Sequence, residues 1–464
     1  MLLGKVFERF AAFSPVTVMM RGVLSYALPT ERIDELFREN AEEQYEDELL
    51  FSTCMNILGL AVNGVRKSVN AAYLASRDEI EVSVTSLYNK LKGTEPAVCQ
   101  ALVRETARRL EPIIAHLNAK RAPRLPGYRL RILDGNHLAG TEHRLTETRL
   151  LNSSPLPGQA LVVLDPEAML MIDAFPCQDA YSQERTLLPQ VLQTVMPDEV
   201  WIADRNFCTT NFLFGLTNKK AYFIIRQHGS TLSGKRLIGR RKRIGRSETG
   251  VIYEQEMVLN DTTTGQDLSV RRITVELDRP NENGEKEIHI LTNLSAEVAD
   301  AMLVAELYHG RWTIESAFQE LDHALRSEVD TLCYPQAALL CFCISLCTYN
   351  MLSTIKAAMR AVHGDAAAIH KLSGYYLAEE ISATYRGMMI AIEQRHWRQA
   401  FESLTVAEMS RLLRQLAEQL RPQRFYKKTR GPKKPPPKRT GGLREKHVST
   451  ARLLNQRRTE KTAK

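Results

Sequence analysis

Helical spacing of apolar residues dominates the first 120 residues. Apolar positions recur every three to four residues in four segments, 33–39, 49–65, 69–74 and 98–117. Residues 83–97 between them resemble a turn into a short helix that carries Tyr88, Lys90 and Lys92. A helix-turn-helix DNA reader and a plain helical bundle both fit this pattern. We therefore expect a helical N-terminal domain over 1–122. Its boundary falls in the proline- and glycine-containing segment 121–127.

The pattern changes to short apolar runs from residue 128. Such runs predict strands at 128–133, 158–166, 168–175, 199–207 and 221–229. The second and third are joined at Asp165–Pro166, as in a hairpin, and helical spacing follows at 181–195 and 209–219. The order strand, hairpin, helix, strand, helix, strand predicts an α/β core with a mixed sheet over 123–335.

Residues 229–294 interrupt that order with alternating segments at 250–259, 268–277 and 287–294, which predict a β-rich insertion. Helical spacing returns from Ser295, and only Gly310 interrupts it before Pro335. A helical C-terminal part is expected over 336–420. Its most apolar stretch, Ala337–Ile355, contains scattered polar residues, so we expect a buried core helix and no membrane span.

Positive charge is concentrated in two places. The net charge of the 464 residues is +8, but 421–464 alone carries 16 Lys and Arg against two Glu, so the remaining 420 residues carry −6. This proline-rich tail has few large apolar residues, and we expect it to be disordered and to bind phosphates. The second cluster has seven basic residues in twelve: Lys235, Arg236, Arg240, Arg241, Lys242, Arg243 and Arg246. Both clusters indicate a nucleic-acid partner.

The cysteines indicate the compartment. None of the eight forms a CxxC pair, which argues for buried thiols in a reducing environment and against a disulfide framework or a zinc site. The N-terminal segment 1–13 mixes charged and apolar residues and is a poor signal peptide. We expect a cytoplasmic protein.

Three acidic residues are the candidate chemistry. Asp134 and Asp204 each follow the apolar core of a predicted strand, where polar groups of α/β sheets line a ligand crevice. On the later helix, Tyr308, Arg311, Glu315 and Asp322 fall within about 60° on one face. A solvated face with an Arg311–Glu315 pair is the plain alternative.

Converging carboxylates need cations, because they would otherwise raise one another's pKa. Oxygen ligands favour two Mg²⁺ ions, with Mn²⁺ as a substitute, for an in-line phosphoryl displacement. His137 and His143 lie near Asp134 but rank below the acids, since Mg²⁺ prefers oxygen. Trp312 is interpreted as a helix-packing anchor.

The motifs LDGNH (133–137), WIADRNF (201–207) and YHGRWTIESAFQEL (308–321) resemble the insertion-sequence DDE transposases of the IS-four family. The resemblance spans about 130 to 330. Its third motif, of the YREK type, is matched by Tyr308, Arg311 and Glu315, whereas Asp322 stands where the family has Lys and replaces a phosphate-binding charge by a repelling one.

The resemblance implies an RNase H-like fold, with Asp134, Asp204 and Glu315 as the metal-binding catalytic triad. It also implies that Tyr308 and Arg311 contact DNA phosphates, and that the insertion helps to hold the transposon end. Arg205, next to Asp204, and Lys219 are the candidates for a phosphate contact that compensates for Asp322.

The expected function is a DNA transposase that cuts and joins double-stranded DNA with terminal inverted repeats, as a homodimer and without a membrane partner. Two alternatives stay open. A structure-selective nuclease would share the triad without joining strands, and a catalytically decayed DNA-binding protein is favoured by Asp322.

Overall fold

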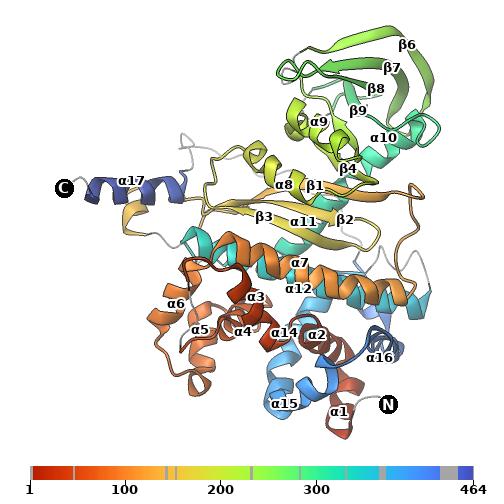
Figure 1. Ribbon diagram of the computed structural model, residues 1–464. Helices are drawn as coiled ribbons and strands as arrows, with labels where there is room; N and C mark the ends of the chain where they lie inside the picture. Colours follow the sequence, from red (N-terminus) through yellow and green to blue (C-terminus); the bar gives the residue numbers. More distant parts are fainter. Residues whose placement is uncertain are drawn as a thin grey trace.

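The computed structural model consists of a long mixed sheet that lies on a layer of helices (Figure 1). It describes residues 4–44, 48–141, 145–151, 154–229, 232, 234–281, 284–329, 332–364, 372–428 and 448–462. The strands are β1 Arg129–His137, β2 Gln159–Asp165, β3 Leu170–Cys177, β4 Glu199–Ala203, β5 Tyr222–Arg226, β6 Arg236–Arg246, β7 Gly250–Asn260, β8 Asp267–Leu277 and β9 Glu287–Thr292.

The α-helices are α1 Lys5–Phe13, α2 Pro15–Ala27, α3 Thr30–Asn40, α4 Phe51–Val62, α5 Val69–Ala75, α6 Val84–Gly93, α7 Pro96–His116, α8 Leu188–Thr194, α9 Thr210–Asn218, α10 Ala301–His309, α11 Trp312–Ala324, α12 Pro335–His363, α14 Gly374–Ala391, α15 Gln394–Trp397, α16 Val406–Glu418 and α17 Thr450–Thr462. Single-turn segments are η1 Arg77–Glu79, η2 Thr146–Thr148, η3 Glu184–Leu187, η4 Arg205–Phe207, the π-helical η5 Arg398–Glu402, and η6 Pro422–Phe425.

The sheet has nine strands in the order β3-β2-β1-β4-β5-β9-β8-β7-β6. Strands β1, β4 and β5 are parallel, β2 pairs antiparallel with β1, and β3 pairs antiparallel with β2. This first half is the predicted RNase H-like arrangement, with helices on both faces. Strand β2 is buried along almost its whole length, which explains its continuous apolar run. The predicted α/β fold with a mixed sheet is confirmed.

The β-rich insertion is confirmed, and it extends the same sheet. Strand β9 pairs with β5, and β8, β7 and β6 follow by antiparallel pairing. Strand β6 therefore lies at the far edge from β3, above the rest of the molecule in Figure 1. Its basic residues are exposed along the strand.

Strand β1 is longer than the pattern predicts. Its pairing with β4 ends at Leu133 opposite Ala203, but its pairing with β2 continues to His137 opposite Gln159. Asp134 therefore lies inside β1, in the part of the strand that pairs with β2 but no longer with β4 and is only half-buried.

The helix predicted to run from Ser295 is in fact two helices, because it breaks at Gly310 between α10 and α11. The Arg124 guanidinium packs against this glycine, where a Cβ atom would come within 2.3 Å of its Nη1. Arg124 also donates a hydrogen bond to the carbonyl of Glu306 at 3.1 Å. The break places Arg311 at the start of α11.

Helix α12 confirms the predicted buried core helix. It is long and apolar enough to cross a membrane, but its most apolar segment is entirely buried inside the protein. Helices α2, α4, α6, α7 and α16 all contact it, so the N-terminal and C-terminal helices share one hydrophobic core beneath the sheet (Figure 1). The N-terminal helices thus pack as a bundle against the core.

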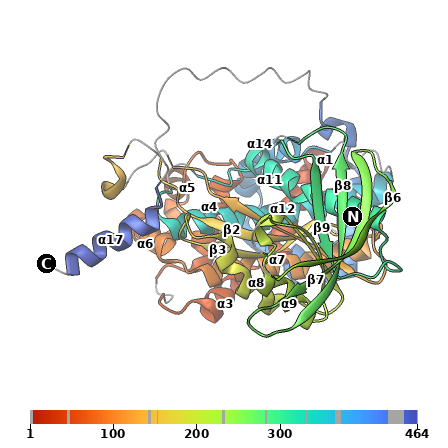
Figure 2. The same ribbon diagram turned by 90° about the horizontal axis from the view of Figure 1, so that it is seen from above.

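The tail is not disordered where the structure describes it. Phe425 of η6 is buried, and α17 is anchored by Ser449, which donates a hydrogen bond to Asp179 at 2.7 Å. Residues 429–447 lie outside the described part. The low apolar content of 421–464 predicted disorder, but Phe425 and Ser449 make specific contacts with the rest of the protein. Helix α17 extends away from the body of the protein (Figure 2).

Candidate active site

Asp134 and Asp204 lie side by side at one edge of the sheet. Leu133 of β1 is directly opposite Ala203 of β4 in a parallel pair. The residues that follow them in the chain are Asp134 and Asp204. Adjacent strands are about 4.8 Å apart, which is within the reach of two carboxylates of a shared site. Asp204 caps η4 by accepting a hydrogen bond from the backbone amide of Asn206 at 2.7 Å.

Glu315 reaches the same place from the first turn of α11, which packs on β1. Arg311 joins it to Asp134. The guanidinium donates through Nη1 to Asp134 Oδ2 at 2.7 Å and through Nη2 to Glu315 Oε1 at 2.6 Å. Arg311 is only 9% exposed. A side chain that spans two carboxylates brings the helix acid to the two strand acids.

The electrostatics of the site are those of crowded acids. The pKa of Asp134 is raised to about 7, and burial is the largest cause. Arg311 opposes the shift, and the nearby charges of Asp204 and Glu315 add to it. Burial alone would lower the pKa of Arg311, but Asp134, Tyr308 and Glu315 raise it overall. One cation therefore balances several negative groups incompletely.

Tyr308 and Arg205 border this group. Tyr308 lies beside Arg311, and burial raises its phenol pKa. Arg205 is exposed and donates to Glu285 Oε1 at 3.0 Å, and the other oxygen of Glu285 accepts from Arg226 at 2.5 Å. Glu285 belongs to the turn between β8 and β9, so the insertion touches the edge that carries Asp204.

The basic cluster of the insertion does not join the three acids. Arg241 pairs with Glu287 at 2.7 Å and lies over the ring of Tyr253, and Arg246 pairs with Asp278 at 2.7 Å. Lys235 donates to a backbone carbonyl at 3.0 Å. Four exposed cations have no carboxylate partner among the residues that the structure describes: Arg236, Arg240, Lys242 and Arg243.

Three other predictions have different outcomes. Asp322 is exposed and accepts a hydrogen bond from Ser327 at 3.2 Å. Trp312 is not a packing anchor, because it is 56% exposed and its ring contacts only His309 among the described rings. That interpretation was wrong because Trp312 starts a new helix instead of continuing a buried face. His137 lies near Glu184, and His143 is outside the described residues.

Glu184 is a fourth acid at this edge that the sequence did not reveal. Its Oε2 accepts a hydrogen bond from the Asn206 side chain, and burial raises its pKa with a further contribution from Asp204. It falls in the segment predicted as one amphipathic helix over 181–195, which the structure divides into η3 and α8. A sharp turn before a helix gives an acid no distinctive spacing.

Metal binding at this site would depend on the geometry and the chemistry of its donor atoms. Within the described part of the chain, no three His, Cys, Asp or Glu side chains are grouped closely enough to hold an ion, and Arg311 lies between Asp134 and Glu315. The chemistry nevertheless fits. Three carboxylates supply the hard oxygens that Mg²⁺ and Mn²⁺ prefer, and their charge is only partly balanced by one guanidinium. Asp134, Asp204 and Glu315 are the residues that would hold such ions.

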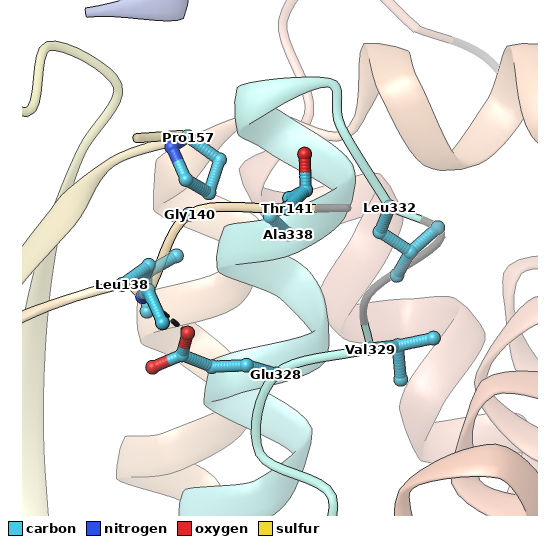
Figure 3. Close-up of a pocket in the computed structure, with 9 residues that line it drawn as sticks. Leu138, Gly140, Thr141, Pro157, Glu328, Val329, Leu332 and Ala338 are labelled. Atoms are coloured by element: carbon cyan, nitrogen blue, oxygen red, sulfur yellow. Dashed lines mark hydrogen bonds between the residues drawn. The ribbon is translucent and has the colours of Figure 1, made fainter. Parts of the chain in front are cut away.

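A small cavity lies beyond the end of β1, and Figure 3 shows the side chains around it. It is lined by Leu138, Ala139, Gly140, Thr141, Pro157, Glu328, Val329, Leu332 and Ala338. Glu328 accepts a hydrogen bond from the backbone amide of Ala139 (Figure 3). The cavity has a volume of about 20 Å³, which is room for roughly one water molecule. It is therefore too small to be a nucleotide site.

Comparison with known proteins supports a transposase domain. Residues 127–351 match the family described as "Transposase DDE domain", a span that includes all three acids. No curated protein sequence matches the chain. A similar solved structure is a piggyBac transposase synaptic complex with hairpin DNA, at 12% identity, 83% coverage of this chain, 84% coverage of that one and a TM-score of 0.38. The IS-four family and its third motif stay predictions.

Proposed function

We propose that the protein is a DNA transposase of the IS-four type, which cuts and joins the ends of an insertion sequence. The observation that carries this proposal is the Arg311 guanidinium, which joins Asp134 and Glu315 beside Asp204. These residues lie inside the span that matches the transposase DDE domain. Because the pairing of β1 with β4 ends here, the acids lie at the C-terminal end of a parallel strand pair, where α/β sheets bind ligands.

The proposed reaction consists of two phosphoryl transfers. Water attacks the phosphate at an element end and the P–O3′ bond breaks, which leaves a 3′-hydroxyl. That hydroxyl then attacks a phosphodiester of the opposite strand, which gives a hairpin, or of the target DNA. The new P–O bond forms as the P–O3′ bond of the attacked strand breaks and releases a 3′-hydroxyl. Each transfer depends on positioning and charge neutralisation more than on covalent protein chemistry.

The roles of the residues follow from their places. Asp134, Asp204 and Glu315 would hold two divalent ions, which supply charge to activate the attacking oxygen and stabilise the leaving one. Tyr308 and Arg311 would bind the phosphate next to the cleaved bond. Arg205 would exchange Glu285 for a phosphate, since a guanidinium binds either group through parallel hydrogen bonds. Joining two ends requires a dimer around paired DNA ends.

Strand joining is the experiment that tests this function. We expect the protein, with Mg²⁺ or Mn²⁺, to join an oligonucleotide with a 3′-hydroxyl to a supercoiled plasmid when the oligonucleotide carries the inverted repeat that flanks the gene. The product is measured as nicked or linear plasmid that carries the labelled strand. An oligonucleotide with a 3′-deoxy end is the control, because it has no nucleophile.

The other two functions give different results in the same assay. Metal-dependent cleavage without joining identifies a structure-selective nuclease. DNA binding without cleavage or joining identifies a catalytically decayed binding protein, for which Asp322 at the third motif is the specific observation.

A second expectation concerns the edge strand β6. Replacing its four unpaired cations together (Arg236, Arg240, Lys242 and Arg243 to Ala) should weaken DNA binding and flatten its salt dependence. Each phosphate contact contributes about 0.9 to the slope of log K against log[salt], so the slope should fall by up to about 4. Fluorescence anisotropy of labelled duplex DNA over a salt series measures both quantities.

Arg241 and Arg246 provide the matched control on the same strand. Because Glu287, Glu276 and Asp278 already neutralise them, Ala at these two positions should change the slope by less per residue than Ala at the four unpaired positions. An equal change per residue for paired and unpaired positions would show that exposure of charge on β6 does not determine the DNA contact.

A further inference from the structure

Glu184 is set against the strand that carries Asp134. It begins η3, after the loop that follows β3, and its side chain turns back towards β1. A Cβ atom built on Gly135 would come within 1.8 Å of Glu184 Oε1, so this carboxylate uses the space that a glycine leaves open. The Glu184 side chain is only 17% exposed. Gly135 thus permits an acid to lie directly beside the candidate triad.

The second oxygen of Glu184 leads to Asp204. Oε2 accepts a hydrogen bond from the Asn206 side-chain amide. The backbone amide of the same Asn206 donates to Asp204 Oδ1 at 2.7 Å. Asn206 therefore has its side chain held by one acid while its backbone holds the other. The two bonds fix the η4 turn on both sides.

The surroundings favour a hydrogen-bonding role over a charge role. Asp204 lies nearby as a like charge, and the nearest cationic candidate, His137 Nδ1, is 4.0 Å from Oε1. A side chain placed for its charge would be expected to have a close basic partner. Instead, Glu184 Oε2 accepts a hydrogen bond from one amide donor, the Asn206 side chain.

We propose that Glu184 is a positioning residue that orients Asp204 through Asn206. The inference rests on the proposed function, in which Asp204 binds metal. Partners that orient a metal ligand without touching the metal typically change metal affinity or activity by 10–100-fold when removed. Neither the family resemblance nor the comparisons assign a role to Glu184 or Asn206.

Two substitutions separate positioning from charge. Glu184→Gln keeps an oxygen that accepts from Asn206 but removes the charge, so we expect Mn²⁺ affinity and cleavage rate within about threefold of wild type. Glu184→Ala removes the acceptor, and we expect both to fall about 10–100-fold. Mn²⁺ binding is measured by electron paramagnetic resonance on the full chain without DNA, and cleavage on labelled element ends.

A double substitution tests the path through Asn206. If Glu184 acts only by holding that side chain, Glu184→Ala combined with Asn206→Ala should be no worse than the more severe single variant. Glu328→Ala is the control, because Glu328 also accepts a hydrogen bond beyond the end of β1, from Ala139, whereas the bond to Asp204 comes from Asn206. It should leave Mn²⁺ affinity unchanged. Thermal melting of each variant verifies that it is folded.

Two outcomes would overturn the positioning role. Glu184→Gln as impaired as Glu184→Ala would mean that the charge itself is required, and full Mn²⁺ affinity in folded Glu184→Ala would mean that the bond has no effect on Asp204. Failure of the proposed function is a separate result, seen as wild-type protein that neither binds Mn²⁺ nor cleaves DNA.

Discussion

Asp134→Asn and Asp204→Asn should each abolish metal-dependent DNA cleavage and strand joining while the protein stays folded. Each removes one negative oxygen ligand at the point where the pairing of β1 with β4 ends. We expect the rate to fall about 10³-fold or more, which corresponds to about 4 kcal/mol of lost transition-state stabilisation. Single-turnover cleavage of a labelled element end, with saturating DNA and a Mg²⁺ titration, measures the loss.

Asp165→Asn is the matched control. Asp165 also ends a strand, but β2 runs antiparallel to β1, so Asp165 lies near the start of β1 and away from the candidate triad. Its hydrogen-bond partners among the described residues are structural. It accepts from Arg131 at 2.9 Å and from the backbone amides of Glu167 and Ala168 at 2.9 Å each. We expect this variant to lose stability and keep its cleavage rate. Equal loss of cleavage in Asp165→Asn would remove the reason to assign Asp134 as the first catalytic acid.

Asp134→Asn also has a stability readout without metal. The pKa of Asp134 is raised to about 7 in the folded protein, from about 4 in an unfolded chain, so the folded state binds the extra proton and wild type loses stability as pH rises between these values. Asn is neutral throughout. The melting temperature of Asp134→Asn should therefore exceed that of wild type by roughly 2–4 °C at pH 8, and by less at pH 5.

The sheet and its two aspartates could be predicted because they rest on local signals. A short apolar run followed directly by Asp predicts both the strand and the position of the acid, and the parallel pairing of β1 with β4 makes the two acids neighbours. The long insertion could also be predicted, since apolar and polar residues alternate regularly along its strands. These features depend on residues close together in sequence.

Other features depend on contacts between distant segments and had no sequence signal. The break at Gly310 involves Arg124, nearly 190 residues earlier, and the approach of Glu184 depends on Gly135. The anchoring of α17 depends on Asp179, whose partners are Ser449 and Arg452. A single sequence shows that these residues exist, but the meeting of such partners is decided by packing of the whole chain.

Arg311 differs from the acids because its removal should affect binding and reaction in opposite directions. In the protein without DNA, its guanidinium occupies the space between Asp134 and Glu315 and supplies the positive charge there. One unit charge about 5 Å from a divalent ion opposes it by several kcal/mol at an effective dielectric of about 20. A metal ion must therefore compete with Arg311 for these oxygens.

Arg311→Ala should bind Mn²⁺ about tenfold more tightly than wild type at pH 8.5 and yet cleave DNA about 10²-fold more slowly. The high pH matters, because loss of Arg311 raises the pKa of Asp134 further and would leave it protonated at pH 7. Cleavage falls because the phosphate contact is lost. Arg311→Lys should recover little of it, since an ammonium cannot span two carboxylates as a guanidinium does.

Arg205→Ala is the control for a general charge effect. Arg205 follows Asp204 in the chain, but Glu285 already neutralises it, so its removal should change Mn²⁺ affinity less than removal of Arg311. Unchanged or weaker Mn²⁺ binding by folded Arg311→Ala would mean that Arg311 supports the ligands instead of competing with the ion. Tighter Mn²⁺ binding together with slower DNA cleavage would mean that the metal ion displaces Arg311 from the carboxylates and that Arg311 then binds the DNA phosphate.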